Sequence, residues 1–560
     1  MQGRAFISIP CHMPSFLFDS HSTEASNTSA TKDQFWDACS LKQLLSQKLL
    51  NQQVIVVSNR EPYLHEHIDD RIDIIQPPGG LVTALEPVLR ACGGTWVAHG
   101  SGSADAECVD DSSACAMPPG IGDYRLRRVW LTALEQAGYL DGFSNQGLWP
   151  LCHLANQPAI FNAEEWRTYQ RVNNRFAEAV VEEACQVDPI ILVQDYHLAL
   201  VPQIVRAKLP KATVVTFWHI PWPNPKTLSA CPWNRELLAG LMGSSIIGLQ
   251  TDVDRRNFLA SVERMPNVDV DHAASTVNHG NCSSFVHTYP ISIDWPEQKD
   301  PPIEEEQFPN LAAINQSSVP KCWPMRAGGK LMVGVDRFDY TKGFLQRMKA
   351  LEHLLATHTD WIGKVSLVQV AAPTRGAVSA YAHFQAQVIS EVNRINNRFA
   401  RCGSVENYRP IYLLNRHHDH DQVTQLYRRA DVCIVSSLHD GMNLVAKEFV
   451  AARNDEVGVL VLSKFAGASA ELQESLLINP HNIEQTANSY LKALIMPACE
   501  QKARMQAMRA TVRKANIFSW AASILLDVSI LRAKTTFDVR ATPTCAPKVV
   551  RLNDLQRAVA

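Results

Sequence analysis

The fold is decided by residues 188–224, which read DPIILVQDYHLALVPQIVRAKLPKATVVTFWHIPWPN. Two runs of apolar and β-branched residues, IILVQ and TVVTF, each end in a polar break, and the residues between them have helical spacing. Strands that are buried on both faces of a sheet read as continuous apolar runs, and a helix that connects two such strands makes them parallel. The segment therefore predicts a strand, a helix and a second, parallel strand.

The same rhythm extends along most of the chain in two series, which are separated by a Pro-rich, acidic stretch. The apolar runs of the first series are VIVVS, TWVAH, IILVQ, TVVTF and SIIGL, and those of the second are KLMVGV, KVSLVQV, PIYLL, DVCIVS and VGVLVL. This pattern predicts an α/β protein with two doubly wound, Rossmann-like parallel-sheet domains. We expect them at 51–295 and 327–500, joined by a linker at 296–326.

The two ends of the chain lie outside this pattern. Residues 1–50 are rich in Ser, Thr, Asn and His, and we expect an N-terminal extension that is disordered in part. C-terminal helices are predicted at 501–535, for which a return to the first domain is left open, followed by a tail at 536–560. The opening residues MQGRAFISIPCHMPSFLF are similar to a signal peptide, but two prolines, a cysteine and a histidine break the apolar stretch.

Composition excludes several classes of protein. The 560 residues are 46% hydrophobic and 19% charged with a formal net charge of -3, which gives no electrostatic reason to expect nucleic acid or an anionic membrane as partner. No apolar run approaches the ~20 residues of a membrane-spanning helix. The 14 cysteines are scattered without a CxxC pair, so we expect reduced thiols, no metal site and a cytoplasmic enzyme.

Charged residues follow the predicted strands of both series. Ligands of open α/β sheets bind beyond the carboxyl ends of the strands, which directs attention to these positions. The residues found there are Arg60, Asp195, His197 and His219 in the first series and Arg337, Lys342, Arg375 and Asp440 in the second. Each one alone also fits a solvated surface charge, but three arginines and a lysine together favour a ligand that carries phosphate groups.

The segment DGMNLVAKE, at 440–448, follows a predicted strand and begins a helix near Asn443. Unpaired backbone N–H groups and the helix dipole make such a helix start suitable for a diphosphate. Glu448 is placed to accept hydrogen bonds from ribose hydroxyls and Asp440 to accept them from a sugar. The alternative is that Asp440 caps the helix and Glu448 is a surface residue.

Asp195, His197 and His219 follow two neighbouring predicted strands, where such groups orient sugar hydroxyls and share protons. A nucleophilic triad is the competing interpretation, but no GxSxG elbow accompanies them. Other patterns carry less weight: a glycine pair at 100–102, a His-rich run at 417–420 that is more typical of a solvated loop than of a metal site, and tryptophans typical of packing. The tryptophans are Trp218, Trp222 and Trp233.

A series of short motifs occurs in order between about Val54 and Trp520. They are SNR at 58–60, GGL at 79–81, FSNQGLWP at 143–150, QDYHL at 194–198, HIPWP at 219–223, YPISID at 289–294, DRFDYTKG at 336–343, PTRG at 373–376, DGMNLVAKE at 440–448 and LSKFAGA at 462–468. In these motifs the chain resembles the trehalose-6-phosphate synthases, retaining glycosyltransferases of family 20. The resemblance implies the GT-B fold, in which two Rossmann-like domains face each other across a cleft.

The resemblance also implies a role for each matched residue on the donor side. Arg337 and Lys342 are expected to bind the diphosphate of a nucleoside-diphosphate glucose, Asp440 its glucose hydroxyls and Glu448 its ribose. Gly80 is expected to let the backbone approach the donor closely. Backbone amides are expected from Met442, Asn443, Leu444 and Val445.

On the acceptor side, the resemblance implies that Arg60, Trp149 and Arg375 face a sugar phosphate, with the two arginines gripping its phosphate. Asp195 and His219 are expected to bind sugar hydroxyls at the reacting centre. The family usually has a tyrosine nine residues before the tryptophan of LWP, where this chain has Leu140, with Tyr139 beside it. Either Tyr139 substitutes for it, or the acceptor differs.

The implied reaction is the transfer of glucose from UDP-glucose, or another nucleoside-diphosphate glucose, to glucose 6-phosphate with retention, in trehalose biosynthesis. The catalytic residues are then Asp195, His219, Arg337, Lys342 and Asp440, and neither a cofactor nor a metal is expected. Alternatives are a glucosylglycerol-phosphate synthase that uses glycerol 3-phosphate, a catalytically silent sugar-phosphate sensor, and an epimerase with a nicotinamide cofactor, for which GxGxxG is missing. A homo-oligomer is left open.

Overall fold

The computed structural model describes residues 35–77, 79–155, 157–280, 282–296, 329–376, 378–400 and 408–541. Residues from Trp36 onward form one compact unit. Residues 1–34, nearly all of the predicted linker and residues 542–560 of the predicted tail lie outside the described residues.

The first half of the chain builds a ten-stranded sheet in the order β10-β11-β12-β9-β8-β7-β1-β4-β6-β5. Its strands are β1 Val54–Arg60, β4 Thr95–His99, β5 Ala114–Met117, β6 Tyr124–Val129, β7 Ile190–Gln194, β8 Thr213–Phe217, β9 Ile246–Leu249, β10 Val268–Asp271, β11 Thr276–His279 and β12 Cys282–Thr288. The central strands of this order, β12, β9, β8, β7, β1, β4 and β6, are parallel, as predicted. The two edges of the sheet depart from this parallel pattern, since β5, β10 and β11 pair antiparallel. These edge strands are short and partly exposed, so they lack the continuous apolar run of a central strand.

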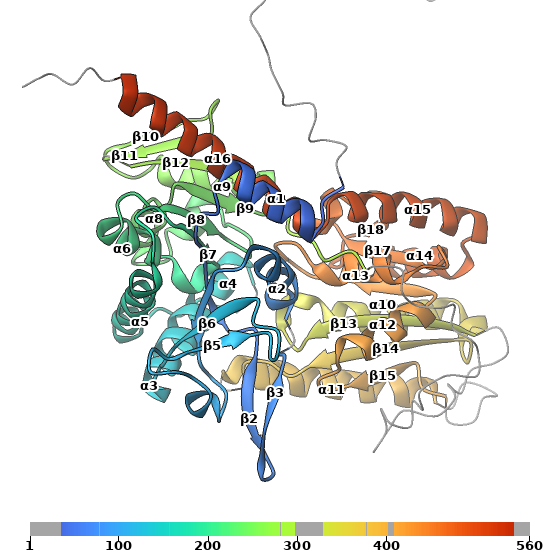
Figure 1. Ribbon diagram of the computed structural model, residues 1–560. Helices are drawn as coiled ribbons and strands as arrows, with labels where there is room; N and C mark the ends of the chain where they lie inside the picture. Colours follow the sequence, from blue (N-terminus) through green and yellow to red (C-terminus); the bar gives the residue numbers. More distant parts are fainter. Residues whose placement is uncertain are drawn as a thin grey trace, which may run out of the picture. The chain divides into compact units, whose positions relative to one another are not determined.

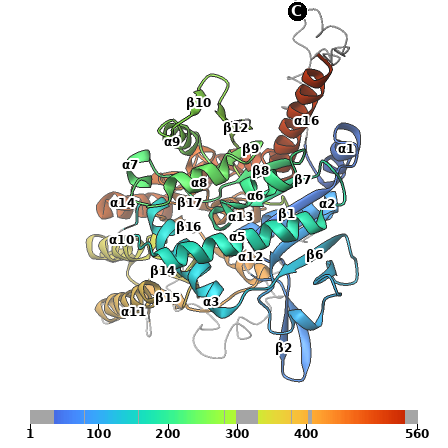
Figure 2. The same cartoon turned by 90° about the vertical axis from the view of Figure 1, so that its left-hand side faces the viewer.

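The second half builds a six-stranded sheet, wholly parallel, in the order β15-β14-β13-β16-β17-β18. Its strands are β13 Lys330–Arg337, β14 Val365–Ala372, β15 Ile411–Leu414, β16 Val432–Val435, β17 Val459–Ser463 and β18 Leu476–Ile478. A separate hairpin, β2 Leu64–Ile68 and β3 Arg71–Ile75, extends away from the first sheet in both views (Figures 1 and 2). The hairpin was not predicted, because its strands are short and mostly polar or exposed.

Helices connect the strands of each sheet. Those of the first half are α1 Ala38–Lys48, α2 Gly80–Cys92, α3 Ala133–Gln136, α4 Trp149–Cys152, α5 Ala163–Glu183, α6 Val201–Lys208, α7 Pro225–Leu228, α8 Asn234–Leu241 and α9 Asp252–Val262, with a π-helix, η2, at Ala137–Leu148. Those of the second half are α10 Phe344–Thr357, α11 Ser379–Phe399, α12 His420–Arg429, α13 Leu444–Ala452, α14 Ile483–Ile495, α15 Ala498–Lys514 and α16 Ile517–Ala541. Short 3-10 helices are η1 Asp105–Glu107, η3 Tyr196–Leu198, η4 Tyr340–Lys342, η5 Thr359–Trp361 and η6 Gly467–Ala470.

Both faces of the first sheet are covered, which explains its continuous apolar runs. Val54 and Val56 of β1 join a core with α1, α2 and α16, whereas Ile55 and Val57 join a core on the opposite face with α5 and α6. Alternate residues of a strand point to opposite faces, so one run of four apolar residues serves two helix layers. Figure 2 shows α5 crossing in front of this sheet.

The last helix returns to the first half of the chain. Asn516, before α16, donates from Nδ2 to the carbonyl of Trp36 at 2.8 Å. Within α16, the ring of Trp520 lies 5.0 Å from that of Phe217 in β8, and Asp527 accepts a 2.6 Å hydrogen bond from the Tyr289 hydroxyl. Figure 1 shows α16 alongside α1. Within the described ranges no single helix is long and apolar enough to span a membrane, although α15 and α16 satisfy that test together across a bend.

Candidate active site

The carboxyl ends of strands from both sheets meet at one junction, which we call the cleft, after the cleft expected of the GT-B fold. Arg60 ends β1, and Asp195 follows β7 directly. Arg375 of the second half donates from Nη2 to the Tyr196 hydroxyl of the first half at 3.1 Å. A Cβ on Gly441 would lie only 2.1 Å from the carbonyl oxygen of His219, so the loop after β16 touches the loop after β8. The residues predicted at the strand ends of the two series are therefore neighbours in space.

An ion pair joins two of the predicted residues on the second sheet. Lys342 Nζ lies 2.6 Å from Asp440 Oδ2, and both side chains are about nine-tenths buried. Ser437 and Asn443 donate to the same oxygen at 3.0 and 3.1 Å. Burial alone would raise the pKa of Asp440, but the charge and hydrogen bond of Lys342 and the hydrogen bond of Asn443 outweigh it and lower the pKa to about 2. Asp440 is therefore an ionised hydrogen-bond acceptor at neutral pH.

The helix that follows, α13, begins at the cleft. Its N-cap is Asn443, whose Oδ1 accepts from the amide of Ala446 at 3.1 Å and whose φ of +80° lies in the left-handed region. The interpretation of Asp440 as the cap is therefore wrong. Asp440 instead fixes the loop through its backbone, donating to Phe465 and accepting from Gly467, both at 3.1 Å. The first-turn amides, among them those of Leu444 and Val445, have no partner within the helix and suit an anion.

Glu448 and Gly80 lie on two helices whose N-termini adjoin the cleft. Glu448, in the second turn of α13, is half-buried and accepts a 3.2 Å hydrogen bond from the Tyr427 hydroxyl, so the interpretation as a surface residue is wrong. Burial raises its pKa. Gly80 begins α2, and a Cβ there would lie 3.0 Å from Cδ1 of Leu444. The positive ends of the two helix dipoles thus lie side by side.

Asp195 and His219 lie at the ends of the adjacent strands β7 and β8. Asp195 has a φ of +72°, a costly conformation for a residue with a side chain, and its Oδ1 accepts from the amide of His219 at 3.1 Å. Burial raises the pKa of Asp195 to about 7 and lowers that of His219 to about 3. His219 Nε2 pairs with Oε1 of Gln194 at 2.8 Å, which leaves Nδ1 as the acceptor of a neutral ring. Burial also lowers the pKa of His197.

Two arginines lie against Trp149, and a third, Arg60, lies close enough to both to be affected by their charges. The Cζ atom of Arg375 lies 3.8 Å from the centre of the indole ring and that of Arg337 lies 5.4 Å from it. Loss of hydration by the surrounding protein and the like charges of Arg337 and Arg375 lower the pKa of Arg60 to about 10. Like charges held together repel one another, so this arrangement suits an anionic ligand.

Residues 52–529 match the sequence model of glycosyltransferase family 20. The chain belongs to this family. It is 36% identical over 479 residues to a trehalose-6-phosphate synthase of Mycolicibacterium vanbaalenii, covering 84% of this chain and 94% of that protein. It is also 36% identical over 498 residues to a bifunctional trehalose-6-phosphate synthase/phosphatase of Thermoproteus tenax, of which it spans only 64%.

A solved structure supports the same assignment. The alpha,alpha-trehalose-phosphate synthase (UDP-forming) of Burkholderia xenovorans in complex with glucose-6-phosphate matches with a TM-score of 0.71 and 31% identity, covering 85% of this chain and 99% of that one. The GT-B fold expected from the motifs is confirmed for this family 20 chain.

The cleft of the family 20 chain also contains residues that the sequence analysis did not single out. His153 is buried beside Trp149, with ring centres 4.0 Å apart, and its Nδ1 pairs with the Trp149 carbonyl at 2.9 Å. Asp339 lies fully buried 3.5 Å from Arg375, which also donates to the Tyr381 hydroxyl. Asp339 belongs to the DRFDYTKG run, and His153 lies four residues after Trp149, so spacing along a helix was the available pattern.

Tyr139 does not reach the cleft of the family 20 chain. Its side chain is fully buried in η2, with its ring 5.8 Å from that of Tyr169 and 6.4 Å from that of His197. Its hydroxyl has no hydrogen-bond partner among the described residues. The suggestion that Tyr139 takes the place of the usual tyrosine is therefore wrong, since no surface of its hydroxyl is open to an acceptor.

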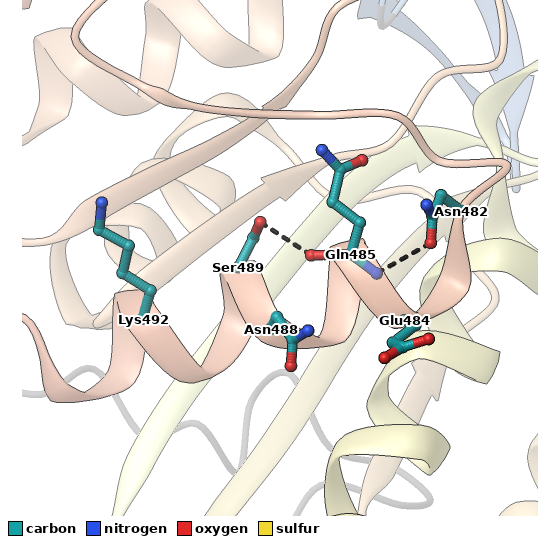
Figure 3. Close-up of a pocket in the computed structure, with 6 residues that line it drawn as sticks. All are labelled: Asn482, Glu484, Gln485, Asn488, Ser489 and Lys492. Atoms are coloured by element: carbon teal, nitrogen blue, oxygen red, sulfur yellow. Dashed lines mark hydrogen bonds between the residues drawn. The ribbon is translucent and has the colours of Figure 1, made fainter.

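Other polar features of the family 20 chain lie apart from the cleft. The His-rich run at 417–420 contains Asp419, the N-cap of α12, and no described group of three or more His, Cys, Asp or Glu side chains is placed to hold a metal ion. A shallow hollow lies along α14 (Figure 3). Its side chains bond along their own helix: Asn482 accepts from the Gln485 amide at 3.0 Å, and Ser489 donates to the Gln485 carbonyl at 3.0 Å. A single helix face provides no enclosure, so we assign no ligand to it.

Proposed function

We propose that this chain is a trehalose-6-phosphate synthase, which transfers glucose from UDP-glucose to glucose 6-phosphate with retention. The observation that carries this proposal is the convergence on one cleft of Arg60, Arg337, Lys342 and Arg375 with the start of α13. These groups provide cationic side chains for two ligands that carry phosphate groups, and we assign Arg337 and Lys342 to the donor region and Arg60 and Arg375 to the acceptor region. The choice of UDP-glucose as donor and glucose 6-phosphate as acceptor is supported by the names of the matched relatives, which are trehalose-6-phosphate synthases.

The donor side belongs to the second domain. Arg337, Lys342 and the first-turn amides of α13 would hold the diphosphate, with Asp440 accepting from glucose hydroxyls and Glu448 from the ribose. As the C1–oxygen bond breaks, negative charge grows on the leaving diphosphate, and fixed cations and amides stabilise it without reorganising. The diphosphate would displace Asp440 as the partner of Lys342, which would leave the Asp440 carboxylate to accept from the sugar.

The acceptor side belongs mainly to the first domain. Arg60 and Arg375 would bind the phosphate of glucose 6-phosphate, and Trp149 would pack against the sugar. Asp195 and neutral His219 would accept hydrogen bonds from sugar hydroxyls at the reacting centre. The leaving phosphate oxygen is the base closest to the attacking hydroxyl, so transfer on one face accounts for retention without a second carboxylate in the manner of retaining glycosidases. We also propose a cytoplasmic location, which the scattered cysteines favour.

Glycerol 3-phosphate is the second candidate acceptor. The buried hydroxyl of Tyr139 and the presence of Leu140 remove a tyrosine that family members usually direct at the acceptor phosphate. A smaller acceptor tolerates this loss better, because fewer contacts are needed to orient it.

The deciding experiment measures release of the nucleoside diphosphate. Purified protein is incubated with UDP-, ADP- or GDP-glucose and with glucose 6-phosphate or glycerol 3-phosphate. We expect the highest kcat/KM with UDP-glucose and glucose 6-phosphate. Preference for glycerol 3-phosphate would establish the second candidate, and release with no pair would leave a silent sensor, which calorimetric binding of the same ligands would detect.

A further inference from the structure

A buried arginine lies behind Arg60 in the first domain. Arg128, in β6, has a side chain with no exposed surface, and its Nε donates to Glu61 Oε2 at 2.8 Å. Its Nη2 lies 2.8 Å from Asp105 Oδ1 and donates to the Tyr63 carbonyl at 3.1 Å. One planar guanidinium on β6 thus joins two segments that leave the carboxyl edge of the first sheet, one after β1 and one after β4.

Glu61, the main partner of Arg128, directly follows Arg60. Glu61 is fully buried whereas Arg60 is exposed, so a Glu61 that is fixed inward holds its neighbour Arg60 outward at the cleft. The second oxygen of Glu61 accepts from the Ser101 amide at 2.7 Å, and the Arg60 carbonyl accepts from the Ser58 hydroxyl at 2.7 Å. The backbone on both sides of Arg60 is therefore tied to the body of the domain.

The second domain repeats this arrangement behind Arg337 and Lys342. Arg347, in α10, also has a side chain with no exposed surface. Its Nη1 donates to Asp336 at 2.7 Å, and its Nε donates to the Ser436 hydroxyl at 3.0 Å. Asp336 directly precedes Arg337, and the Ser436 hydroxyl donates in turn to the Lys342 carbonyl at 3.2 Å.

In each domain a fully buried arginine thus grips a carboxylate that is the sequence neighbour of a cleft arginine. A buried ion pair by itself contributes little net stability, because the loss of hydration offsets the attraction. The buried ion pair does provide a fixed geometry, because the N–H groups of one guanidinium can bond several acceptors at once in only one arrangement.

We propose that Arg128 and Arg347 are positioning residues with separate effects: Arg128 aims Arg60 at the phosphate of the acceptor, and Arg347 aims Arg337 and Lys342 at the diphosphate of the donor. This rests on the proposed function, because it takes the two cationic regions as the acceptor and donor sites. The proposal goes beyond that function because it makes the affinity for the acceptor depend on Arg128 and the affinity for the donor depend on Arg347, neither of which touches a substrate.

The test is a crossed kinetic comparison of Arg128→Lys and Arg347→Lys. Lysine keeps the charge but offers a single nitrogen, which cannot hold the separate acceptors together. Because a misplacement of about 1 Å in a substrate-positioning group can cost about 10²-fold in rate, a smaller displacement of a cleft arginine is expected to cost about tenfold. We expect Arg128→Lys to raise the KM for glucose 6-phosphate about tenfold and to leave the KM for UDP-glucose within about twofold of wild type. Arg347→Lys should do the reverse.

Arg206→Lys is the matched control. Arg206 also joins separate segments, donating to the Ala212 and Gly243 carbonyls and the Ser245 hydroxyl at 2.6, 3.2 and 2.7 Å. These segments precede β8 and β9, at the edge of the sheet opposite the cleft. Its substitution should lower the melting temperature and leave both KM values unchanged.

Wild-type turnover is measured first. If the wild-type protein shows no turnover, the proposed function has failed. The two lysine variants are then compared by their calorimetric dissociation constants for UDP and for glucose 6-phosphate. If a lysine variant does not fold, Glu61→Gln and Asp336→Asn replace the pair, because they retain side-chain volume and should give the same pattern. The inference is overturned if each substitution shifts both affinities alike, or if the melting temperature falls and neither affinity changes.

Discussion

The ion pair between Lys342 and Asp440 leads to a prediction in which a second substitution restores the stability of a variant but does not restore its activity. The pKa of Asp440 is about 2 instead of 3.8, and each pKa unit corresponds to about 1.36 kcal/mol. Ionised Asp440 therefore contributes about 2 kcal/mol to the free energy of unfolding. Because the pKa is lowered, this contribution is complete above about pH 4 and is lost only as the pH falls toward 2.

Lys342→Met removes the cation and leaves Asp440 buried with only neutral donors. The loss at pH 7 is at least the same ~2 kcal/mol, and it approaches the ~3 kcal/mol typical of an abandoned buried charge. Adding Asp440→Asn to this variant removes the uncompensated charge, so most of the lost stability should return. Both variants should be inactive, because each lacks Lys342, the side chain proposed to bind the diphosphate of the donor.

The assay is urea unfolding at pH 7 followed by tryptophan fluorescence, with UDP release measured on the same preparations. The midpoint for the double variant should lie between those of Lys342→Met and wild type, nearer to wild type. A double variant no more stable than Lys342→Met would refute the reasoning, since it would mean that the Asp440 charge was never balanced by Lys342.

Three further perturbations follow from the cleft. Because burial raises the pKa of Asp195 to about 7, kcat/KM should rise with pH through about 7 as this acceptor ionises. Asp195→Asn should flatten that limb of the pH–rate profile, and an unchanged limb would assign it to another group. A Cβ at Gly441 would lie 2.1 Å from the His219 carbonyl oxygen in the first half of the chain, so Gly441→Ala should lower kcat/KM at least about tenfold. Near-normal turnover would mean that the two loops separate freely. Tyr427→Phe removes the 3.2 Å hydrogen bond to Glu448 and should raise the KM for UDP-glucose about fivefold with kcat retained, whereas an unchanged KM would argue against Glu448 as the ribose ligand.

The central strands could be predicted from the sequence because the ten-stranded and the six-stranded sheet are each buried on both faces. A run such as IILVQ needs no partner to be recognised, and the residue that follows it is placed at the carboxyl edge by the same pattern. Asp195 and Arg375 could therefore be assigned to strand ends. The start of α13 was readable for a similar reason, since a polar loop separates the apolar run of β16 from helical spacing.

Features that depend on contacts between distant parts of the chain could not be predicted from the sequence. Arg128 and Glu61 are 67 positions apart, and only the folded sheet shows that they pair. The antiparallel edges of the first sheet and the β2–β3 hairpin lack continuous apolar runs, so periodicity does not separate them from loops. The burial of Tyr139 arises from the π-helix, whose extra residue per turn changes which side chains face the core.

The return of α16 to the first sheet has a consequence for the order in which the protein matures. A nascent chain leaves the ribosome from its N-terminus, and domains generally fold as units as they emerge. Here Trp520 covers the ring of Phe217, and Asp527 accepts from Tyr289, so the first sheet waits for a helix made after the whole of the second sheet. During synthesis its apolar surface stays uncovered while about 230 further residues are added, which takes roughly 10–50 s at about 5–20 residues per second. A chain that stops before residue 515 would remain permanently in that state, which makes chaperone dependence and aggregation of C-terminally shortened forms a property of the topology.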